Sequence, residues 1–143
     1  MSPIIFEKGT QNFDDLGLGL LPDSMSAFVT EDLNGQFILE IQYPVDGRNY
    51  SLLKVNRLIK VDAGHRLLGQ AFIVRQIKQN IDLTVSIYAE HISYLALDMA
   101  LKPTQTYTNR TAQQALQAWQ NQMIDTTPFI VYSDITTPNK VTF

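Results

Sequence analysis

The chain has 143 residues, no cysteine, a formal net charge of −3 and a hydrophobic share of 45%. The lack of cysteine excludes disulfides, thiolate nucleophiles and cysteine-ligated zinc, and the weakly acidic charge gives no electrostatic reason to expect nucleic-acid binding. No apolar run approaches the ~20 residues of a membrane span, and the first residues lack the pattern of a signal peptide. We expect one domain, or one domain with a small appendage.

The first residues predict a short strand followed by a loop. Ile4–Phe6 is an apolar run that ends at Lys8-Gly9-Thr10. Glycines, a proline and aspartates indicate a loop over 12–23. Its leucines lead us to expect that the loop packs against the rest of the chain: Leu16, Leu18, Leu20 and Leu21.

The strongest local signal is a hairpin from Ser26 to Tyr43. Asn34-Gly35 separates two alternating runs, and this pair best tolerates the positive φ that a type I′ turn requires at both central residues. Pro44 should end the second strand because it cannot donate to a ladder. One face of that strand holds four large apolar residues at period two: Phe37, Leu39, Ile41 and Tyr43.

Shorter elements and a second hairpin follow. The predicted elements are a turn at 45–48, a helical turn at Tyr50–Leu53, a strand at Leu58–Val61, a loop at 63–69, and hairpin strands at Gln70–Asn80 and Leu83–Ala89. In the first hairpin strand we place Phe72, Val74 and Gln76 on one face. In the second we place Leu83, Val85, Ile87 and Ala89 on one face. Short strands with turns every 8–12 residues or so predict a small antiparallel barrel or sandwich over residues 1–95.

Residues 96–143 predict a partial α+β segment, so the chain as a whole is mainly β with an α+β appendage. The clear helix is Thr111–Ile124, with Thr111 as N-cap. Its apolar stripe is Ala112, Ala115, Leu116, Trp119 and Met123, and its polar face is Gln113, Gln114, Gln117, Gln120 and Gln122. Around it we expect a short helix at 92–99, a connector at 102–109, a strand at Phe129–Tyr132 and an open tail at 136–143.

The sequence predicts no catalytic, cofactor-binding or metal-binding residue. His65 and His91 do not have the spacing of metal ligands. A Glu90–His91 acid–base pair is geometrically poor because neighbouring strand residues point to opposite faces, so we interpret His91 as a capping or surface histidine.

The remaining candidates have structural interpretations. The acids Asp14-Asp15, Glu31-Asp32 and Asp46 lack the pattern of a calcium loop and are interpreted as solvated turn residues. Gly17-Leu18-Gly19 is no phosphate loop. Tyr50 and Trp119 suit core packing better than a ligand platform.

Several blocks, in this order, resemble a known family. They are V-T-E-D-L-N-G at 29–35, L-E-I-Q-Y-P-V-D-G at 39–47, Q-A-F-I-V at 70–74, Y-A-E-H-I-S-Y-L at 88–95, the amphipathic helix, and P-F-I-V-Y-S-D at 128–134. Together they resemble the N-terminal region of the tail-associated minor structural proteins of siphophages and prophages of Gram-positive bacteria, also called prophage endopeptidase tail or tail-associated lysin proteins. The resemblance covers nearly the whole chain.

The resemblance implies a structural function. That region of the family is similar to the central hub of contractile-phage baseplates. It forms a homotrimer at the virion tail tip that closes the tail tube, with the distal tail ring and tape-measure proteins as partners. The lytic activity of the family belongs to C-terminal modules, so we expect this chain to be no enzyme and to need no cofactor. The family hub runs to several hundred residues, so we expect a shortened or naturally short version here, made in the bacterial host cytoplasm.

Two alternatives are a small cell-wall-directed hydrolase and a carbohydrate-binding β-module. The hydrolase would need a nucleophile, a carboxylate pair or a metal site. The module would need exposed aromatic side chains on one face. For the hub segment, Val141-Thr142-Phe143 suggests a strand without a partner. We therefore expect the isolated chain to be a monomer, or a weak oligomer formed through an exposed edge near Phe129–Tyr132.

Overall fold

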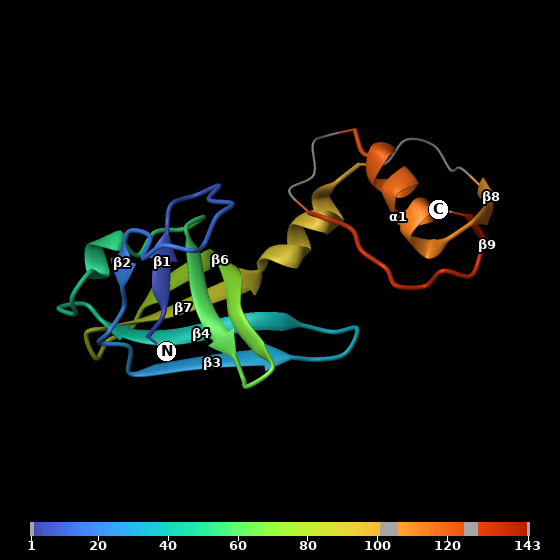
Figure 1. The fold of residues 1–143 in the computed structure, drawn as a ribbon. Coiled ribbons are helices and arrows are strands. Elements are labelled where there is room, and N and C mark those ends of the chain that lie inside the picture. Colours follow the sequence, from blue (N-terminus) through green and yellow to red (C-terminus); the bar gives the residue numbers. More distant parts are fainter. Residues whose placement is uncertain (1, 101–105, 125–128, 143) are drawn as a thin grey trace. The chain divides into compact units, whose positions relative to one another are not determined.

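A computed structural model of the chain describes residues 2–100, 106–124 and 129–142. The chain divides into two compact units, residues 1–94 and 95–143 (Figure 1). The predicted fold class is confirmed: an antiparallel seven-stranded sheet curls into a half-barrel, and a smaller helix-containing segment accompanies it. None of the helices in the described ranges is long and apolar enough to cross a membrane.

All seven strands of the first unit pair antiparallel, in the order β2-β1-β5-β6-β7-β4-β3. They are β1 (Ile4–Phe6), β2 (Gly19–Leu20), β3 (Ser26–Glu31), β4 (Phe37–Pro44), β5 (Leu58–Ala63), β6 (Leu67–Gln79) and β7 (Thr84–His91). The 3-10 helix η1 (Tyr50–Leu52) follows β4, and η2 (Ile92–Asp98) follows β7, which confirms both predicted helical positions. The predicted loop at 63–69 is too long, because β5 and β6 extend into it.

The core lies on the inner face of the curled sheet. Alternate residues of β4, β6 and β7 point into it, as period-two patterning requires. Its fully buried members include Ile5, Leu21, Leu39, Tyr43, Ile59, Phe72, Val74 and Ala89. Leu53 and Tyr50 from the η1 region also pack there, as predicted.

The loop over 12–23 packs through different residues from those predicted. Of its four leucines only Leu21 is buried, whereas Leu16 is 67% exposed. The loop is held instead by Phe13, whose ring meets Phe6 edge-on at 5.1 Å. Gly17 also lies close to the sheet: its φ is +54°, and a Cβ there would lie 2.4 Å from the carbonyl oxygen of Ile5. Leucine spacing was therefore a poor guide to the buried side of this loop.

The first hairpin is confirmed, but its predicted type I′ turn is wrong. Asp32 N–H donates to the Gln36 carbonyl at 2.8 Å, and Gly35 N–H donates to the Asp32 carbonyl at 3.0 Å. The central residues are therefore Leu33 and Asn34. Only Asn34 has positive φ, at 57°. Positive φ at the second central position alone is the requirement of a type II turn, which asparagine tolerates.

The second hairpin is confirmed with two corrections. The ladder between β6 and β7 shifts between Val74 and Gln76, so a bulge at Arg75 reverses the alternation. Ile77 therefore packs toward the core and Gln76 does not share the face of Phe72 and Val74. Leu83 lies in the turn with φ 60° and is exposed, so it does not join the buried face of β7.

The second unit contains α1 (Ala112–Asn121) and a two-stranded sheet of β8 (Thr106–Arg110) and β9 (Asn139–Thr142). The N-cap prediction is confirmed: Thr111 and Gln114 form a reciprocal capping box. The predicted connector and open tail are wrong within the described residues, because β8 and β9 pair with each other. The predicted unpartnered strand near Val141 therefore has a partner; Phe143 and 101–105 lie outside the described residues.

The glutamine face of α1 holds a neighbouring segment. Gln113 donates to the carbonyl of Val131 at 3.0 Å and accepts from the amide of Ser133 at 2.7 Å, while Gln120 donates to the carbonyl of Phe129 at 2.7 Å. The strand predicted at Phe129–Tyr132 is therefore wrong, since its backbone is bound by helix side chains. The predicted polar face of the helix therefore binds a neighbouring backbone segment through Gln113 and Gln120, which we call the α1 clamp.

Candidate functional site

The two histidines, the only ones in the chain, have different surroundings. His65 is exposed in the turn between β5 and β6. His91 is half-buried at the end of β7, where its ring stacks on Phe37 at 4.1 Å and meets Phe72 edge-on at 5.3 Å. Burial lowers the pKa of His91 below its usual value of 6.5. The neutral ring is therefore favoured near neutral pH.

The hydrogen bonds of His91 assign its tautomer and its role. The backbone N–H of Ser93 donates to Nδ1 at 3.2 Å, so Nδ1 is the unprotonated nitrogen and also accepts from the Ser93 hydroxyl at 2.8 Å. Nε2–H then donates to Oε1 of Gln70 at 3.2 Å. Because Ser93 lies in the first turn of η2, His91 caps that helix, which is one of the two alternatives, capping or surface, that the sequence left open.

Tyr94 ties the same region to the tip of the first hairpin. Its hydroxyl accepts from the amide of Phe37 at 3.0 Å and donates to the carbonyl of Gly35 at 3.3 Å. We call Phe37, Gln70, Phe72, His91, Ser93 and Tyr94 the His91 cluster. The cluster joins the block at 88–95 to the end of the first hairpin turn.

The arrangement around His91 has little resemblance to an acid–base site. Glu90 is engaged by Arg75, whose Nε lies 2.9 Å from its carboxylate. In a Ser-His-Asp triad, the imidazole nitrogen that faces away from the serine is bonded to a carboxylate. In His91 the nitrogen that faces away from Ser93 is bonded to the neutral amide of Gln70. Neighbouring strand positions thus separate Glu90 from His91, as the alternation of the strand predicts.

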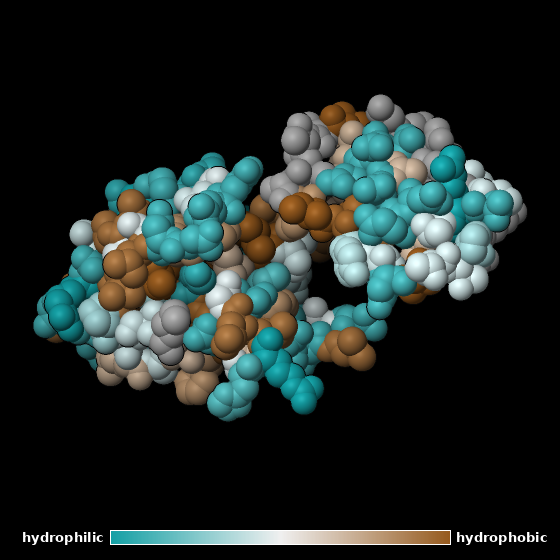
Figure 2. All heavy atoms as spheres, in the orientation of Figure 1, coloured by the Kyte–Doolittle hydropathy of each residue, from teal (hydrophilic) through white to brown (hydrophobic). Residues whose placement is uncertain are grey.

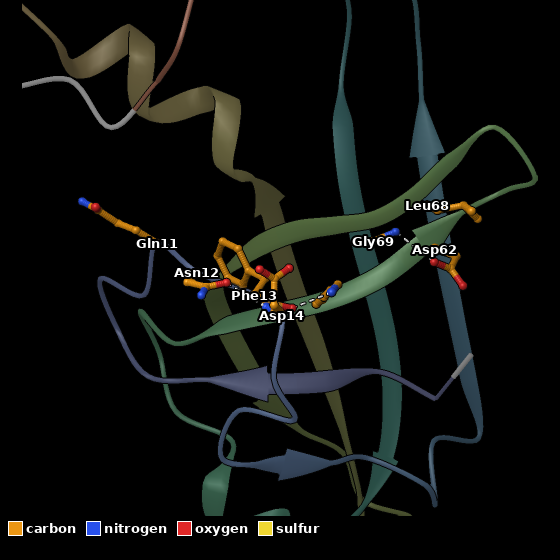
Figure 3. A pocket seen from close by; sticks show the side chains of 8 residues that line it. Gln11, Asn12, Phe13, Asp14, Asp62, Leu68 and Gly69 are labelled. Carbon is orange, nitrogen blue, oxygen red and sulfur yellow. Dashed lines mark hydrogen bonds between the residues drawn. The ribbon is translucent and has the colours of Figure 1, made fainter.

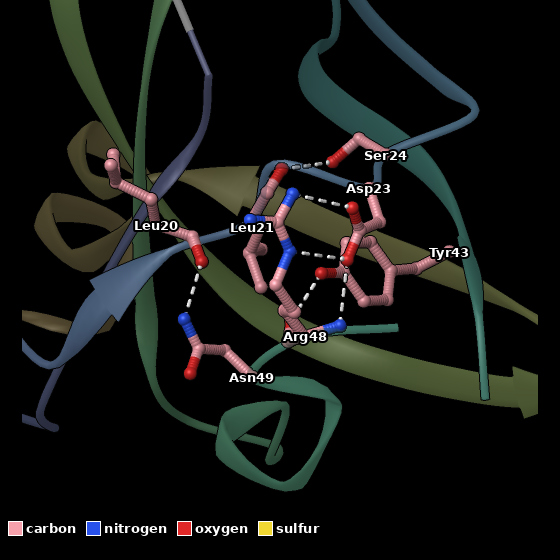
Figure 4. A network of polar contacts seen from close by, with 7 residues as sticks. All are labelled: Leu20, Leu21, Asp23, Ser24, Tyr43, Arg48 and Asn49. Atoms are coloured by element: carbon pink, nitrogen blue, oxygen red, sulfur yellow. Dashed lines mark hydrogen bonds and ion pairs between the residues drawn. The ribbon is translucent and has the colours of Figure 1, made fainter. Parts of the chain in front are cut away.

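A second polar network follows β4 (Figure 4). Arg48 donates to Asp23 from its backbone N–H at 2.7 Å and from Nη2 at 3.0 Å. These hydrogen bonds hold the pKa of Asp23 below its usual value. The hydroxyl of buried Tyr43 donates to the carbonyl of Arg48, and burial raises the pKa of that hydroxyl. Asn49, at φ 64°, donates to the carbonyl of Leu20.

This network explains the Y-P-V-D-G block. Gly47 N–H donates to the carbonyl of Pro44 at 3.1 Å, and a Cβ on Gly47 would lie 2.6 Å from the ring of Tyr43. The block therefore folds the chain tightly over the tyrosine and directs Arg48 toward Asp23. The Arg48–Asp23 pair links positions 25 residues apart, and nothing in the local sequence pattern indicated it.

A hollow of about 570 Å³ lies between the first loop and the sheet (Figure 3). It is lined by Gln11, Asn12, Phe13, Asp14, Lys60, Asp62, Leu68 and Gly69. Two of its polar side chains serve the fold: Lys60 Nζ donates to the carbonyl of Phe13 at 2.6 Å, and Asp62 accepts from the amide of Gly69 at 2.9 Å. The polar side chains of this hollow therefore have structural roles: Lys60 attaches the first loop to β5, and Asp62 joins β5 to β6.

The candidate acids stay apart from one another. Within 2–100, 106–124 and 129–142, no three His, Asp or Glu side chains converge as metal ligands. Asp14 and Asp15 lie in the first loop, where Asp15 accepts from the amide of Gly17 at 2.8 Å. Tyr50 packs against the core, and Trp119 is half-buried on α1.

Comparisons with models of protein families, with curated proteins and with solved structures found no match to this chain.

Proposed function

We propose that this chain is a structural segment of the tail tip of a phage or prophage, equivalent to the N-terminal part of a hub protein, acting in tail assembly and host attachment. The observation that carries the proposal is the bond of Tyr94 to the first hairpin, because it joins two of the blocks on which the family resemblance rests. Residues far apart in the sequence that together hold one architecture suit a rigid structural framework better than a mobile reaction site. In this proposal the complete hub is a homotrimer that contacts the distal tail ring and the tape-measure protein.

The proposed function is non-enzymatic. The most reactive-looking pair, His91 and Ser93, is accounted for by the cap of η2 and by the stack on Phe37. The Y-P-V-D-G block is accounted for by the turn over Tyr43. His91, Ser93 and the Y-P-V-D-G block thus each have a structural explanation.

Deletion of the coding region in a lysogen tests the proposal. After induction we expect filled heads but defective tail tips and a loss of infectious particles of at least a hundredfold, restored by the wild-type gene in trans. Purified chain should release no reducing sugars or peptides from cell wall. Normal infectious particles from the deletion strain, or cell-wall cleavage abolished by Ser93→Ala, would overturn the proposal.

A further inference from the structure

The two edges of the seven-stranded sheet are built differently. The β2 edge has two residues, and Pro22 follows it closely. The β3 edge has six residues, pairs with β4 without a register shift, and contains no proline, lysine or arginine. Proteins usually protect a sheet edge with short strands, prolines, bulges or charged side chains. Only Glu31, at the end of β3, offers such protection.

The ladder shows which backbone groups of β3 point away from the sheet. Asp32 N–H donates to Gln36 on the β4 side, and Val45 N–H donates to Leu83 on the β7 side. Because residues alternate in an antiparallel ladder, even-numbered residues of β3 bond to β4. The N–H and C=O groups of Ala27, Val29 and Glu31 therefore point outward, along one line, in position to pair with another strand.

The side chains beside this edge define a pattern for such a strand. On the outer face Phe28 is 68% exposed and lies opposite the exposed Glu40, with Asp32 at the end of the row. On the inner face Ala27 and Val29 pair with the buried Ile41 and Leu39. Figure 1 shows β3 at the edge of the sheet, beside β4. Figure 2 shows that hydrophobic residues reach the surface of the first unit among hydrophilic ones.

The charge of the hairpin is one-sided. Residues 26–44 contain Glu31, Asp32 and Glu40, all exposed, and no lysine or arginine. Pairing of β3 with the β3 of a second copy would add no basic side chain to this acidic hairpin, so a second copy offers no charge complementarity. A strand with basic side chains on the outer face would instead place them beside Phe28 and Asp32, with Glu40 one strand further in, within reach of a long lysine side chain. Its basic groups would also lie over the ring of Phe28.

We propose that β3 is a docking strand for an extended segment of a partner protein whose residues alternate between basic and apolar. The basic side chains lie on the outer face, and the apolar ones continue the core layer beyond Val29. Backbone hydrogen bonds to Ala27, Val29 and Glu31 supply the pairing, as in other cases of strand addition to a sheet edge. This inference goes beyond the proposed tail function and does not depend on it.

The test is an amide NMR titration of the 143-residue chain with an end-blocked (Lys-Val)4 peptide, against (Glu-Val)4 as the matched control. We expect (Lys-Val)4 to shift the amide signals of Ala27, Val29 and Glu31 and to slow their hydrogen exchange, while (Glu-Val)4 leaves them unchanged. Glu40→Gln with Asp32→Asn should weaken binding about three- to tenfold, because both substitutions remove a carboxylate that the lysine side chains of the added strand can reach.

A proline variant separates edge pairing from simple charge attraction. Ala27→Pro removes one outward N–H that the ladder with β4 does not use, so the fold should remain and binding should be lost. If that variant does not fold, the carboxylate variants decide alone. The proposal fails if both peptides shift β3 equally, if neither does, if Ala27→Pro binds like wild type, or if β3 signals instead depend on protein concentration, which would identify a second copy as the occupant.

Discussion

Gly47 offers the sharpest test of how the Y-P-V-D-G block works. In a Gly47→Ala variant the new Cβ would lie 2.6 Å from Cε1 of Tyr43 and 3.0 Å from the carbonyl oxygen of Pro44. Neither neighbour can yield easily: the Tyr43 ring is fully buried and its hydroxyl is bonded to Arg48, while the Pro44 carbonyl accepts from Gly47 itself.

The expected change in the free energy of unfolding of Gly47→Ala is the sum of two opposing contributions. Overpacking costs about 1–3 kcal/mol. The φ of Gly47 is not positive, so alanine adds no left-handed strain and restricts the unfolded chain, a gain of about 0.4–1 kcal/mol. We expect a net destabilisation of about 1–2 kcal/mol, measured by urea unfolding.

Asp46→Ala is the matched control, since Asp46 is exposed in the same turn. Its stability should stay within about 0.5 kcal/mol of wild type. A Gly47→Ala protein as stable as wild type would refute the close approach of this turn to Tyr43.

Three further predictions concern the His91 cluster and the α1 clamp. The pKa of folded His91 is below 6.5, so the unfolded chain takes up its proton first as the pH drops. The free energy of unfolding should therefore fall as the pH drops from about 7 toward the folded pKa. Urea unfolding of His91→Gln should lack this pH-dependent component, and a pH profile identical to that of the wild type would contradict the prediction. Tyr94→Phe leaves the Phe37 amide without its acceptor and should cost about 1–3 kcal/mol in the same assay, whereas no loss would argue against the bridge. Gln113→Ala should speed hydrogen exchange at the Ser133 amide at least tenfold, while Gln117→Ala, on an exposed position, should not; equal rates would rule out the clamp.

Local sequence patterns predicted the strands well, but not the bulge or the exact turn residues between them. Period-two alternation located both hairpins, because burial of one face pins a strand in register. The same pattern did not reveal the bulge at Arg75, since an extra residue leaves the apolar count unchanged and only shifts it. The Asn34-Gly35 pair marked the first turn, yet Leu33 and Asn34 are central, because one asparagine at positive φ suffices there.

The candidate site depended on contacts that sequence spacing does not encode. Capping by His91 could be predicted from the sequence, because the residue lies at a strand end directly before a short helix. Its stack on Phe37 and the Tyr94 bridge join residues more than 50 positions apart. Likewise the amphipathic pattern of α1 predicted polar surface at Gln113, because glutamine can satisfy solvent or a passing backbone equally well.

Immunogold labelling tests the central claim most directly. Antibody raised against the 143-residue chain should label intact particles from the induced lysogen at the tail end distal to the head, and particles from the deletion strain should carry no label. Label on the head or along the tail would contradict a structural function at the tail tip. Intact particles that carry no label, and that mass spectrometry shows to lack the chain, would contradict it as well.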